Sequence, residues 1–113
     1  MNKFKSIVED KGIYKHVLKE GYGDKISTGS IIKYNYKGTT GNLNNKNIEF
    51  SNNYSLIKYK DFKGWDIMLQ TMKKGEVSLF VIRYDYGFGR IGYEDIPPYT
   101  DLIYYVHIID VKN

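Results

Sequence analysis

Three glycines, Gly87, Gly89 and Gly92, stand in the hexapeptide GFGRIG, which has the spacing G-x-G-x-x-G. In a dinucleotide-binding protein this spacing brings a tight turn and the N-terminus of a helix against a pyrophosphate. The chemistry needs a strand before the glycines, a helix after them, and a second parallel strand that carries an acid about twenty residues further on. The flanking residues therefore decide whether the motif is functional.

The residues that follow the hexapeptide do not support dinucleotide binding. An apolar segment precedes the glycines, but the residues after Gly92 are Tyr-Glu-Asp-Ile followed by Pro97 and Pro98. Two prolines about one turn beyond the last glycine would break the helix that should hold the pyrophosphate. We therefore expect no nucleotide and no other cofactor.

The same segment, residues 84–101, is rich in rings. Its aromatic residues are Tyr84, Tyr86, Phe88, Tyr93 and Tyr99. Glycines allow such a loop to fold over an apolar cavity and present rings to it. The alternative is a surface loop whose rings pack back on the core. Composition alone leaves both alternatives open.

Composition excludes several other kinds of chemistry. The chain has no cysteine, which removes disulfides and thiolate nucleophiles and fits a reducing compartment, so we expect a cytoplasmic protein. The two histidines, His16 and His107, stand far apart without an evident ligand partner, and we expect no metal site. The acid pair Glu94 and Asp95 is typical of solvated loops, and no serine stands in a nucleophile elbow.

The charge pattern argues against nucleic-acid and membrane binding. The net charge is +4, but the positive charge is nearly all lysine spread along the chain, with Arg83 and Arg90 as the only arginines. Base readout favours arginine and a binding face needs clustered charge. The sequence has no run of 18 apolar residues, and its charged N-terminus lacks the apolar core of a secretory signal. We therefore expect no nucleic-acid partner and no membrane association.

The elements that must position any site are mostly strands. Apolar, β-branched or alternating segments that are bounded by turn residues indicate strands. Strands are predicted over residues 13–20, 31–37, 54–60, 77–83 and 102–111, a turn over 21–24, and a polar loop over 38–53 with a short extended piece at 47–50. In the second strand Ile32, Tyr34 and Tyr36 share one face.

One segment changes to the helical period. Its apolar residues recur at i, i+3, i+7 and i+10, as Phe62, Trp65, Leu69 and Met72. This spacing predicts a helix over residues 61–74, with Asp61 as its cap and Gly75 as the left-handed residue that ends it. Strands joined by such short connections pair mostly antiparallel, so the pattern predicts an α+β domain of about five strands and one short helix.

Several motifs, in order, resemble one known family. Residues 84–111 contain YDYGFGRIG and IPPYTDLIYYVHIIDV, and they resemble the D-Y-x-Y-G-x-x-G, I-P-P and L-x-F-x-V-E-L-L motifs of FKBP-type peptidyl-prolyl isomerases, the immunophilins. IKYNYKG resembles V-x-V-H-Y-x-G, FKGW resembles I-x-G-W, and MKKGE resembles M-x-x-G-E/Q. The resemblance covers roughly residues 12–112. We therefore divide the chain into an N-terminal segment, 1–11, and a single FKBP-like domain, 12–113.

The resemblance implies a fold and an activity. The fold is a five- to six-stranded antiparallel half-barrel wrapped around one short helix, with an apolar pocket between helix and sheet. The activity is rotamase activity, in which cis-trans isomerisation of X–Pro bonds is accelerated and protein folding is assisted. Partial double-bond character sets the uncatalysed barrier at roughly 18–20 kcal/mol. A water-poor pocket stabilises the polar planar amide less than water does and so favours the twisted transition state.

The resemblance also assigns the pocket, with Trp65 as the floor under the prolyl ring. The candidate catalytic residues are Tyr36, Phe62, Trp65, Phe88, Ile96 and Tyr104, and the candidate substrate- or inhibitor-binding residues are Ile48, Glu49, Phe50, Tyr54 and Tyr93. Either Ile48 or Phe50 takes the place of the phenylalanine in the family's F-D-S-S. By residue type alone, a tryptophan on an apolar helix stripe, such as Trp65, is more often plain core. Tyr36 and Tyr104 are equally compatible with a site and with plain core packing. The assignment requires a dry, ring-lined hollow beside the indole.

Two functions remain open. The first is an isomerase that acts on proline-containing polypeptide clients as a monomer and binds macrolide immunosuppressants weakly. The second is a catalytically weak or inactive interaction domain, because Phe88 replaces the family's tyrosine, whose hydroxyl holds a ligand carbonyl. Residues 9–24 also resemble the lead domain of larger chaperone-associated proteins with TPR-type repeats. Membership of such a protein would imply chaperone partners.

Overall fold

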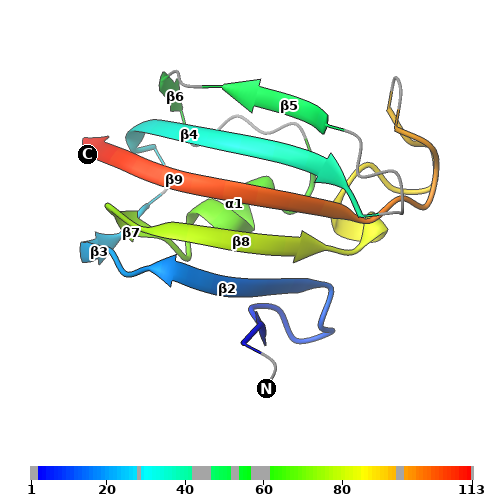
Figure 1. Ribbon diagram of the computed structural model, residues 1–113, viewed down its shortest axis with the longest axis horizontal. Coiled ribbons are helices and arrows are strands. Elements are labelled where there is room, and N and C mark those ends of the chain that lie inside the picture. Colours follow the sequence, from blue (N-terminus) through cyan, green and yellow to red (C-terminus); the bar gives the residue numbers. More distant parts are fainter. Residues whose placement is uncertain are drawn as a thin grey trace.

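The computed structural model describes residues 3–27, 29–41, 47–51, 54–56, 62–93 and 96–112, and of residues 47–51 and 54–56 it describes the backbone. Its elements in chain order are β1 (Lys5–Ser6), β2 (Ile13–Lys19), β3 (Tyr22–Lys25), β4 (Ile31–Thr40), β5 (Asn47–Ser51), β6 (Tyr54–Leu56), α1 (Trp65–Leu69), β7 (Lys73–Lys74), β8 (Val77–Ile82), the 3-10 turn η1 (Tyr84–Tyr86) and β9 (Leu102–Lys112). Helix α1 lies against one face of the main sheet (Figure 1).

The main sheet is antiparallel throughout. Its seven strands run in the order β1-β2-β8-β9-β4-β5, with β6 also paired to β4, and β3 and β7 form a separate two-stranded sheet. This arrangement confirms the predicted α+β class of an antiparallel sheet around one short helix. The sheet has more strands than predicted because β1 contains only two residues, which is too short for a hydrophobic pattern.

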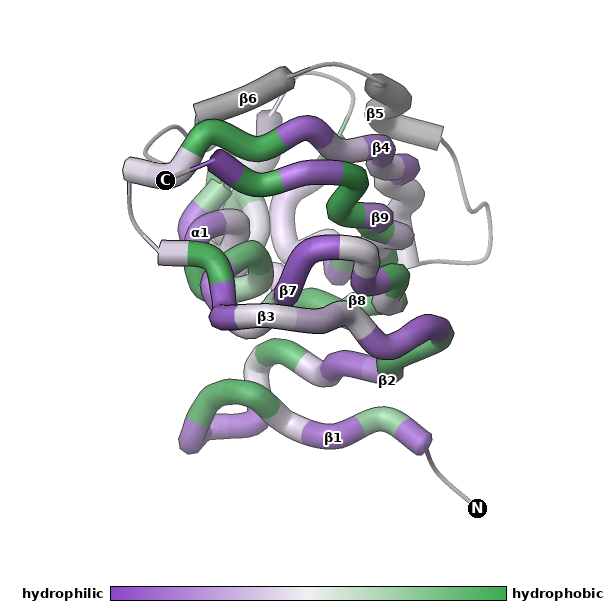
Figure 2. The backbone as a smooth tube through the Cα atoms, turned by 90° about the vertical axis from the view of Figure 1, so that its left-hand side faces the viewer, coloured by the Kyte–Doolittle hydropathy of each residue, from purple (hydrophilic) through white to green (hydrophobic). Residues whose placement is uncertain are grey.

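Side-chain alternation explains how the sheet covers the helix. Along β9, Leu102, Tyr104, Val106 and Ile108 are fully buried, whereas the residues between them face the other side. In Figure 2, β9 lies between β4 and β8 and carries both apolar and hydrophilic stretches. Because successive side chains point to opposite faces of a strand, one set enters the core with the helix. Each fully buried Leu, Ile or Phe stabilises the fold by about 1.5–3 kcal/mol.

The predicted strands at 13–20, 77–83 and 102–111 are confirmed as β2, β8 and β9. The strand predicted at 31–37 is also confirmed, and it continues to Thr40 as β4. Of the strand predicted at 54–60, the described part is β6, and residues 57–60 lie outside the described residues. The turn predicted at 21–24 is wrong, because residues 22–25 form β3 against β7. Its partner has two residues and lies far away in sequence, so no local pattern reveals it.

The predicted helix over 61–74 is too long. Helix α1 begins at Trp65 after Gly64, which makes no side-chain cap, and Asp61 lies outside the described residues. At the other end the chain tightens into turns and enters β7. Gly75 is left-handed as expected, with φ 84°, but it serves the turn between β7 and β8 rather than ending a helix. The predicted apolar stripe is nevertheless buried along its whole length, including Phe62 and Met72, which lie outside the helix.

Candidate functional site

The candidate site centres on the Trp65 indole, where α1 meets the sheet. Ring centroids of Tyr34, Tyr36, Phe62 and Tyr104 lie 5.9, 5.4, 5.6 and 5.6 Å from that of Trp65. The rings meet edge-on or tilted, which is the arrangement that aromatic quadrupoles favour. The predicted residues Tyr36 and Tyr104 come from the adjacent strands β4 and β9, and their rings stack at 6.0 Å. The structure therefore brings four of the six candidate catalytic residues into one cluster.

Phe88 and Ile96 join this cluster from the aromatic loop, the ring-rich segment of residues 84–101. Phe88 lies 5.5 Å from Phe62 and is half-buried. Tyr93, a candidate binding residue, stacks on the Phe88 ring with the two ring centroids 5.2 Å apart, and it is 56 % exposed. Ile96 is buried in the core with Phe62, Trp65 and Tyr104, and the partly buried Tyr36 and Phe88 pack against that core. All six candidate catalytic residues thus belong to one apolar cluster, and their roles stay predictions.

Tyr34 is a member that the sequence analysis did not assign to the site. The alternation in β4 did place it on the same face as Tyr36, and the two rings stack at 5.4 Å. Tyr34 is 6 % exposed and contacts the indole from the side. The period-two pattern was therefore a sufficient signal for its position.

Four candidate binding residues lie where only the backbone is described. Ile48, Glu49 and Phe50 are in β5, and Tyr54 is in β6. Their side chains lie outside the described residues, and so does the choice between Ile48 and Phe50. Both strands pair with β4, the strand that carries Tyr36.

The lack of a side chain at Gly38 makes room for the ring of Tyr104. The two residues are cross-strand partners in β4 and β9, and a Cβ at position 38 would lie 2.5 Å from the ring carbon Cζ of Tyr104. The ring therefore lies over the bare backbone of Gly38. This close approach lets the Tyr104 ring reach both Tyr36 and the indole.

Replacing Gly38 with alanine is expected to destabilise the protein by about 1–3 kcal/mol, because the new methyl group overpacks the core and displaces the Tyr104 ring. Urea unfolding measures the loss, and near-ultraviolet circular dichroism reports the changed ring packing. Lys37→Ala, an exposed neighbour in the same strand, is the matched control. An unchanged unfolding midpoint for Gly38→Ala would show that the Tyr104 ring moves at no cost.

The glycines of the aromatic loop serve turns. Gly89 and Gly92 have φ of 72° and 79°, and the Tyr93 and Ile96 amides each donate to the other residue's carbonyl, at 3.0 and 2.8 Å. The segment is thus a closed turn and not the beginning of a helix. The sequence left open whether the rings of this loop pack on the core or are presented outward. Phe88 packs back on Phe62, whereas Tyr93 and Tyr99 are exposed.

The loop is joined to the helix by one backbone hydrogen bond. The Gly64 amide donates to the Tyr86 carbonyl at 2.6 Å, directly before the first residue of α1. The position of the loop and that of Trp65 are therefore coupled. The coupling is invisible in the sequence, because it joins two backbone groups.

The cluster offers an apolar, aromatic surface. The indole of Trp65 is 3 % exposed, while Tyr36 and Phe88 are partly exposed. Of these three rings, Tyr36 and Phe88 are therefore the ones that water reaches more readily. Among the described residues no three His, Asp or Glu side chains are grouped as metal ligands. No described helix is long and apolar enough to cross a membrane.

The amino-acid sequence of the chain is similar to known proteins of one family. The family model described as FKBP-type peptidyl-prolyl cis-trans isomerase matches residues 23–109. The FKBP-type peptidyl-prolyl cis-trans isomerase FkpA of Escherichia coli is 31 % identical over 107 residues, which cover 89 % of this chain and 38 % of that protein. The human protein named inactive peptidyl-prolyl cis-trans isomerase FKBP6 is 28 % identical, over 89 % of this chain and 33 % of its own.

A solved structure agrees with these sequence matches. The crystal structure of a peptidyl-prolyl cis-trans isomerase from Pseudomonas syringae superposes with a TM-score of 0.85 and 25 % identity, covering 100 % of this chain and 84 % of that one. The chain spans less than half the length of the curated relatives named above. The likeness therefore concerns one domain of those proteins.

Proposed function

Because the chain belongs to the family of FKBP-type peptidyl-prolyl cis-trans isomerases, we propose that it accelerates cis-trans isomerisation of X–Pro bonds in which X is apolar. The observation that carries the proposal is the continuous ring cluster between α1 and the sheet. It consists of Tyr36, Trp65, Tyr104 and Phe62, with Phe88 joined to it through Phe62. The clients would be proline-containing polypeptides. The absence of cysteine supports a reducing, cytoplasmic location.

The proposed mechanism is differential solvation of one amide. In the planar ground state, resonance puts negative charge on the amide oxygen and positive charge on the nitrogen. Among rings this dipole loses the stabilisation that water provides, whereas the twisted transition state has a weaker dipole and loses less. Each ~1.4 kcal/mol of such differential stabilisation is a tenfold gain in rate. Trp65 would support the prolyl ring, and Tyr36 and Phe88 would cover the amide.

The direct test is an isomerisation assay with short Leu-Pro and Phe-Pro peptides. We expect acceleration that is proportional to protein concentration and that saturates with peptide. Circular dichroism on the same sample establishes that the protein is folded. A folded protein that leaves both peptides at their uncatalysed rates would refute the proposal.

Phe88→Tyr is expected to raise kcat/KM by about 2- to 10-fold, the value of one added neutral hydrogen bond. The new hydroxyl would lie at the half-buried ring beside Phe62 and could hold the carbonyl of the peptide. Tyr84→Phe is the control, because it changes one hydroxyl in the same loop on a ring that contacts Tyr99 instead. Equal kcat/KM for Phe88→Tyr and the wild type would exclude the proposed carbonyl contact.

The second candidate is an interaction domain that binds proline-containing segments without catalysis. Phe88 favours it, and so does the similarity to a human relative whose name includes the word inactive. Titration of Trp65 fluorescence with the same peptides separates the two candidates. Saturable binding without acceleration supports the interaction domain, and binding with acceleration supports the enzyme.

A further inference from the structure

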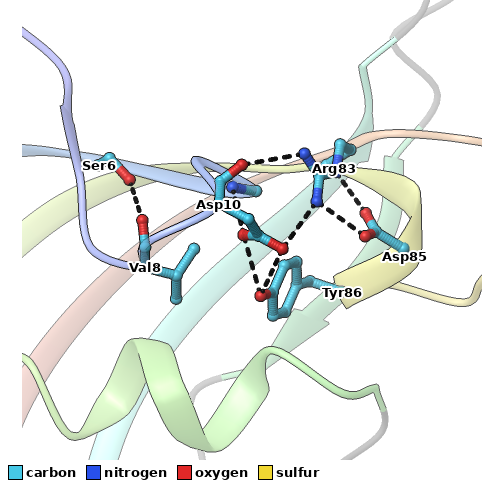
Figure 3. Close-up of polar contacts among 7 residues, drawn as sticks. Ser6, Val8, Asp10, Arg83, Asp85 and Tyr86 are labelled. Atoms are coloured by element: carbon cyan, nitrogen blue, oxygen red, sulfur yellow. Dashed lines mark hydrogen bonds and ion pairs between the residues drawn. The ribbon is translucent and has the colours of Figure 1, made fainter.

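The N-terminal segment reaches the aromatic loop through Asp10. Its carboxylate accepts hydrogen bonds from the Gly12 amide at 3.1 Å, from Arg83 Nη2 at 3.1 Å, and from the Tyr86 hydroxyl at 3.0 Å (Figure 3). Arg83 Nη1 also donates to the Asp10 carbonyl at 3.2 Å. The residues are 73 and 76 positions apart in sequence. The carboxylate of one exposed aspartate therefore accepts from one donor in its own segment and from two donors in a distant one.

Arg83 completes the network on the loop side. It donates to both carboxylate oxygens of Asp85, from Nε at 2.6 Å and from Nη2 at 2.8 Å, and its backbone amide donates to the Gly12 carbonyl at 2.7 Å. A two-point contact of this kind fixes the plane of the guanidinium. An isolated exposed ion pair contributes little, but several shared charges with good geometry contribute more.

Two pKa shifts agree with this geometry. The hydrogen bond from Arg83 lowers the pKa of Asp85, and the hydrogen bond to Asp10, followed by burial, raises the pKa of Tyr86. The Arg83–Asp85 pair therefore contributes to folding stability in full above the ordinary carboxyl pKa, and this contribution is lost as the pH falls through the lowered pKa of Asp85. The Tyr86–Asp10 hydrogen bond contributes to folding stability in full below the ordinary phenol pKa, and this contribution is lost as the pH rises through the raised pKa of Tyr86. At neutral pH both are complete.

Tyr86 connects the N-terminal segment with the residues of the candidate site. Its ring packs against Gly12, where a Cβ would collide with it, and its hydroxyl is held by Asp10. Its carbonyl accepts the hydrogen bond from Gly64 that precedes Trp65. Two residues further along the loop, Phe88 lies against Phe62. Tyr86 is thus held at its hydroxyl by the N-terminal segment and at its carbonyl by the start of α1.

We infer that Asp10 and Tyr86 are positioning residues, which hold the aromatic loop and Phe88 in register with Trp65. The inference rests on the proposed isomerase function, and it assigns a part in the site to the segment that the sequence analysis set outside the domain. Neither side chain needs to touch the substrate. Loss of the Asp10–Tyr86 contact leaves the core intact but allows residues 84–93 to open more often.

The test combines hydrogen exchange with kinetics in two variants, Asp10→Asn and Tyr86→Phe. We expect exchange of the Gly87 and Gly89 amides, both bonded to the Tyr84 carbonyl, to accelerate about 2- to 10-fold, the equivalent of one lost hydrogen bond. The Gly75 and Ile108 amides lie outside the loop, are bonded to other backbone carbonyls, and should keep their wild-type exchange rates. In the same variants kcat/KM for a Leu-Pro peptide should fall by a similar factor.

Asp110→Asn is the matched control. Asp110 forms an exposed pair with Lys74 at 3.0 Å, with exposure similar to that of Arg83 and Asp10, but outside the loop. It should change neither loop exchange nor kcat/KM. A combined Asp10→Asn and Tyr86→Phe variant should be no worse than the more affected single variant, because both remove the same contact.

The outcomes are distinguishable from failure of the isomerase proposal. Unchanged exchange at Gly87 and Gly89, or equal acceleration at all four amides, overturns the positioning role whatever the activity. Faster loop exchange with unchanged kcat/KM in an active protein also overturns it. If the wild type proves inactive, the affinity of the peptide measured by Trp65 fluorescence replaces kcat/KM. Unchanged affinity would then overturn the inference.

Discussion

Truncation of Trp65 to alanine is expected to lower the free energy of unfolding by about 3–5 kcal/mol, the usual cost of removing a large buried aromatic side chain. The indole is 3 % exposed and contacts four other rings, so its removal leaves a cavity that rigid neighbours fill poorly. Urea unfolding followed by circular dichroism measures the loss. Tyr93→Ala, which removes an exposed ring from the aromatic loop, should cost far less.

The Trp65→Phe variant tests whether Trp65 contributes to catalysis. A domain's total stability is about 5–15 kcal/mol, so the alanine variant could be inactive merely because it is partly unfolded. Phenylalanine keeps an apolar ring and most of the packing while it reduces the surface that supports a prolyl ring. We expect kcat/KM to fall by about 2- to 10-fold, the equivalent of one lost ring contact. A stable Trp65→Phe protein with full activity would remove Trp65 from the mechanism.

Replacing Glu76 with glutamine is expected to cost about 3–5 kcal/mol, because it leaves the charge of Lys15 buried without its counter-ion. Glu76 Oε2 lies 2.8 Å from Lys15 Nζ, and the two side chains are 4 % and 11 % exposed. The Ser78 hydroxyl and the Lys73 amide also donate to the Glu76 carboxylate. Urea unfolding again gives the magnitude.

The same ion pair supports the helix of the site. Lys15 Nζ donates to the Thr71 carbonyl at 2.8 Å, just beyond the end of α1, while Glu76 stands directly before β8. The pair therefore ties the end of the helix to strands β2 and β8. We expect Glu76→Gln to weaken peptide binding as well as stability, since the orientation of Trp65 depends on this helix.

Two further variants identify the cause of the Glu76→Gln effect. Lys74→Ala breaks the exposed pair with Asp110 and should cost at most about 1 kcal/mol. Lys15→Met combined with Glu76→Gln should recover part of the loss, because no buried charge then remains unpaired. A loss below 1 kcal/mol for Glu76→Gln alone would show that water reaches Lys15 in solution.

Much of the sheet was predictable because its signals are local. Strands β2, β4, β8 and β9 are long enough to show alternation, and each side of a strand faces either the core or the solvent. The 62–72 stripe identified buried residues correctly even where the backbone is not helical. The extent of the helix was not predictable, because after Leu69 the chain turns into β7, which pairs with β3, a segment far away in the chain.

The sequence by itself determined the antiparallel α+β class, the alternation that puts Tyr34 and Tyr36 on one face and, through ordered motifs, the family. Only the tertiary structure decided which side chains meet: Tyr104 over Gly38, Lys15 with Glu76, and Asp10 with Tyr86. The physical reason is the distance along the chain over which each kind of interaction acts. Periodicity and turn preference act within a few residues, whereas ring contacts, buried ion pairs and hydrogen bonds form wherever strand register brings two distant residues together.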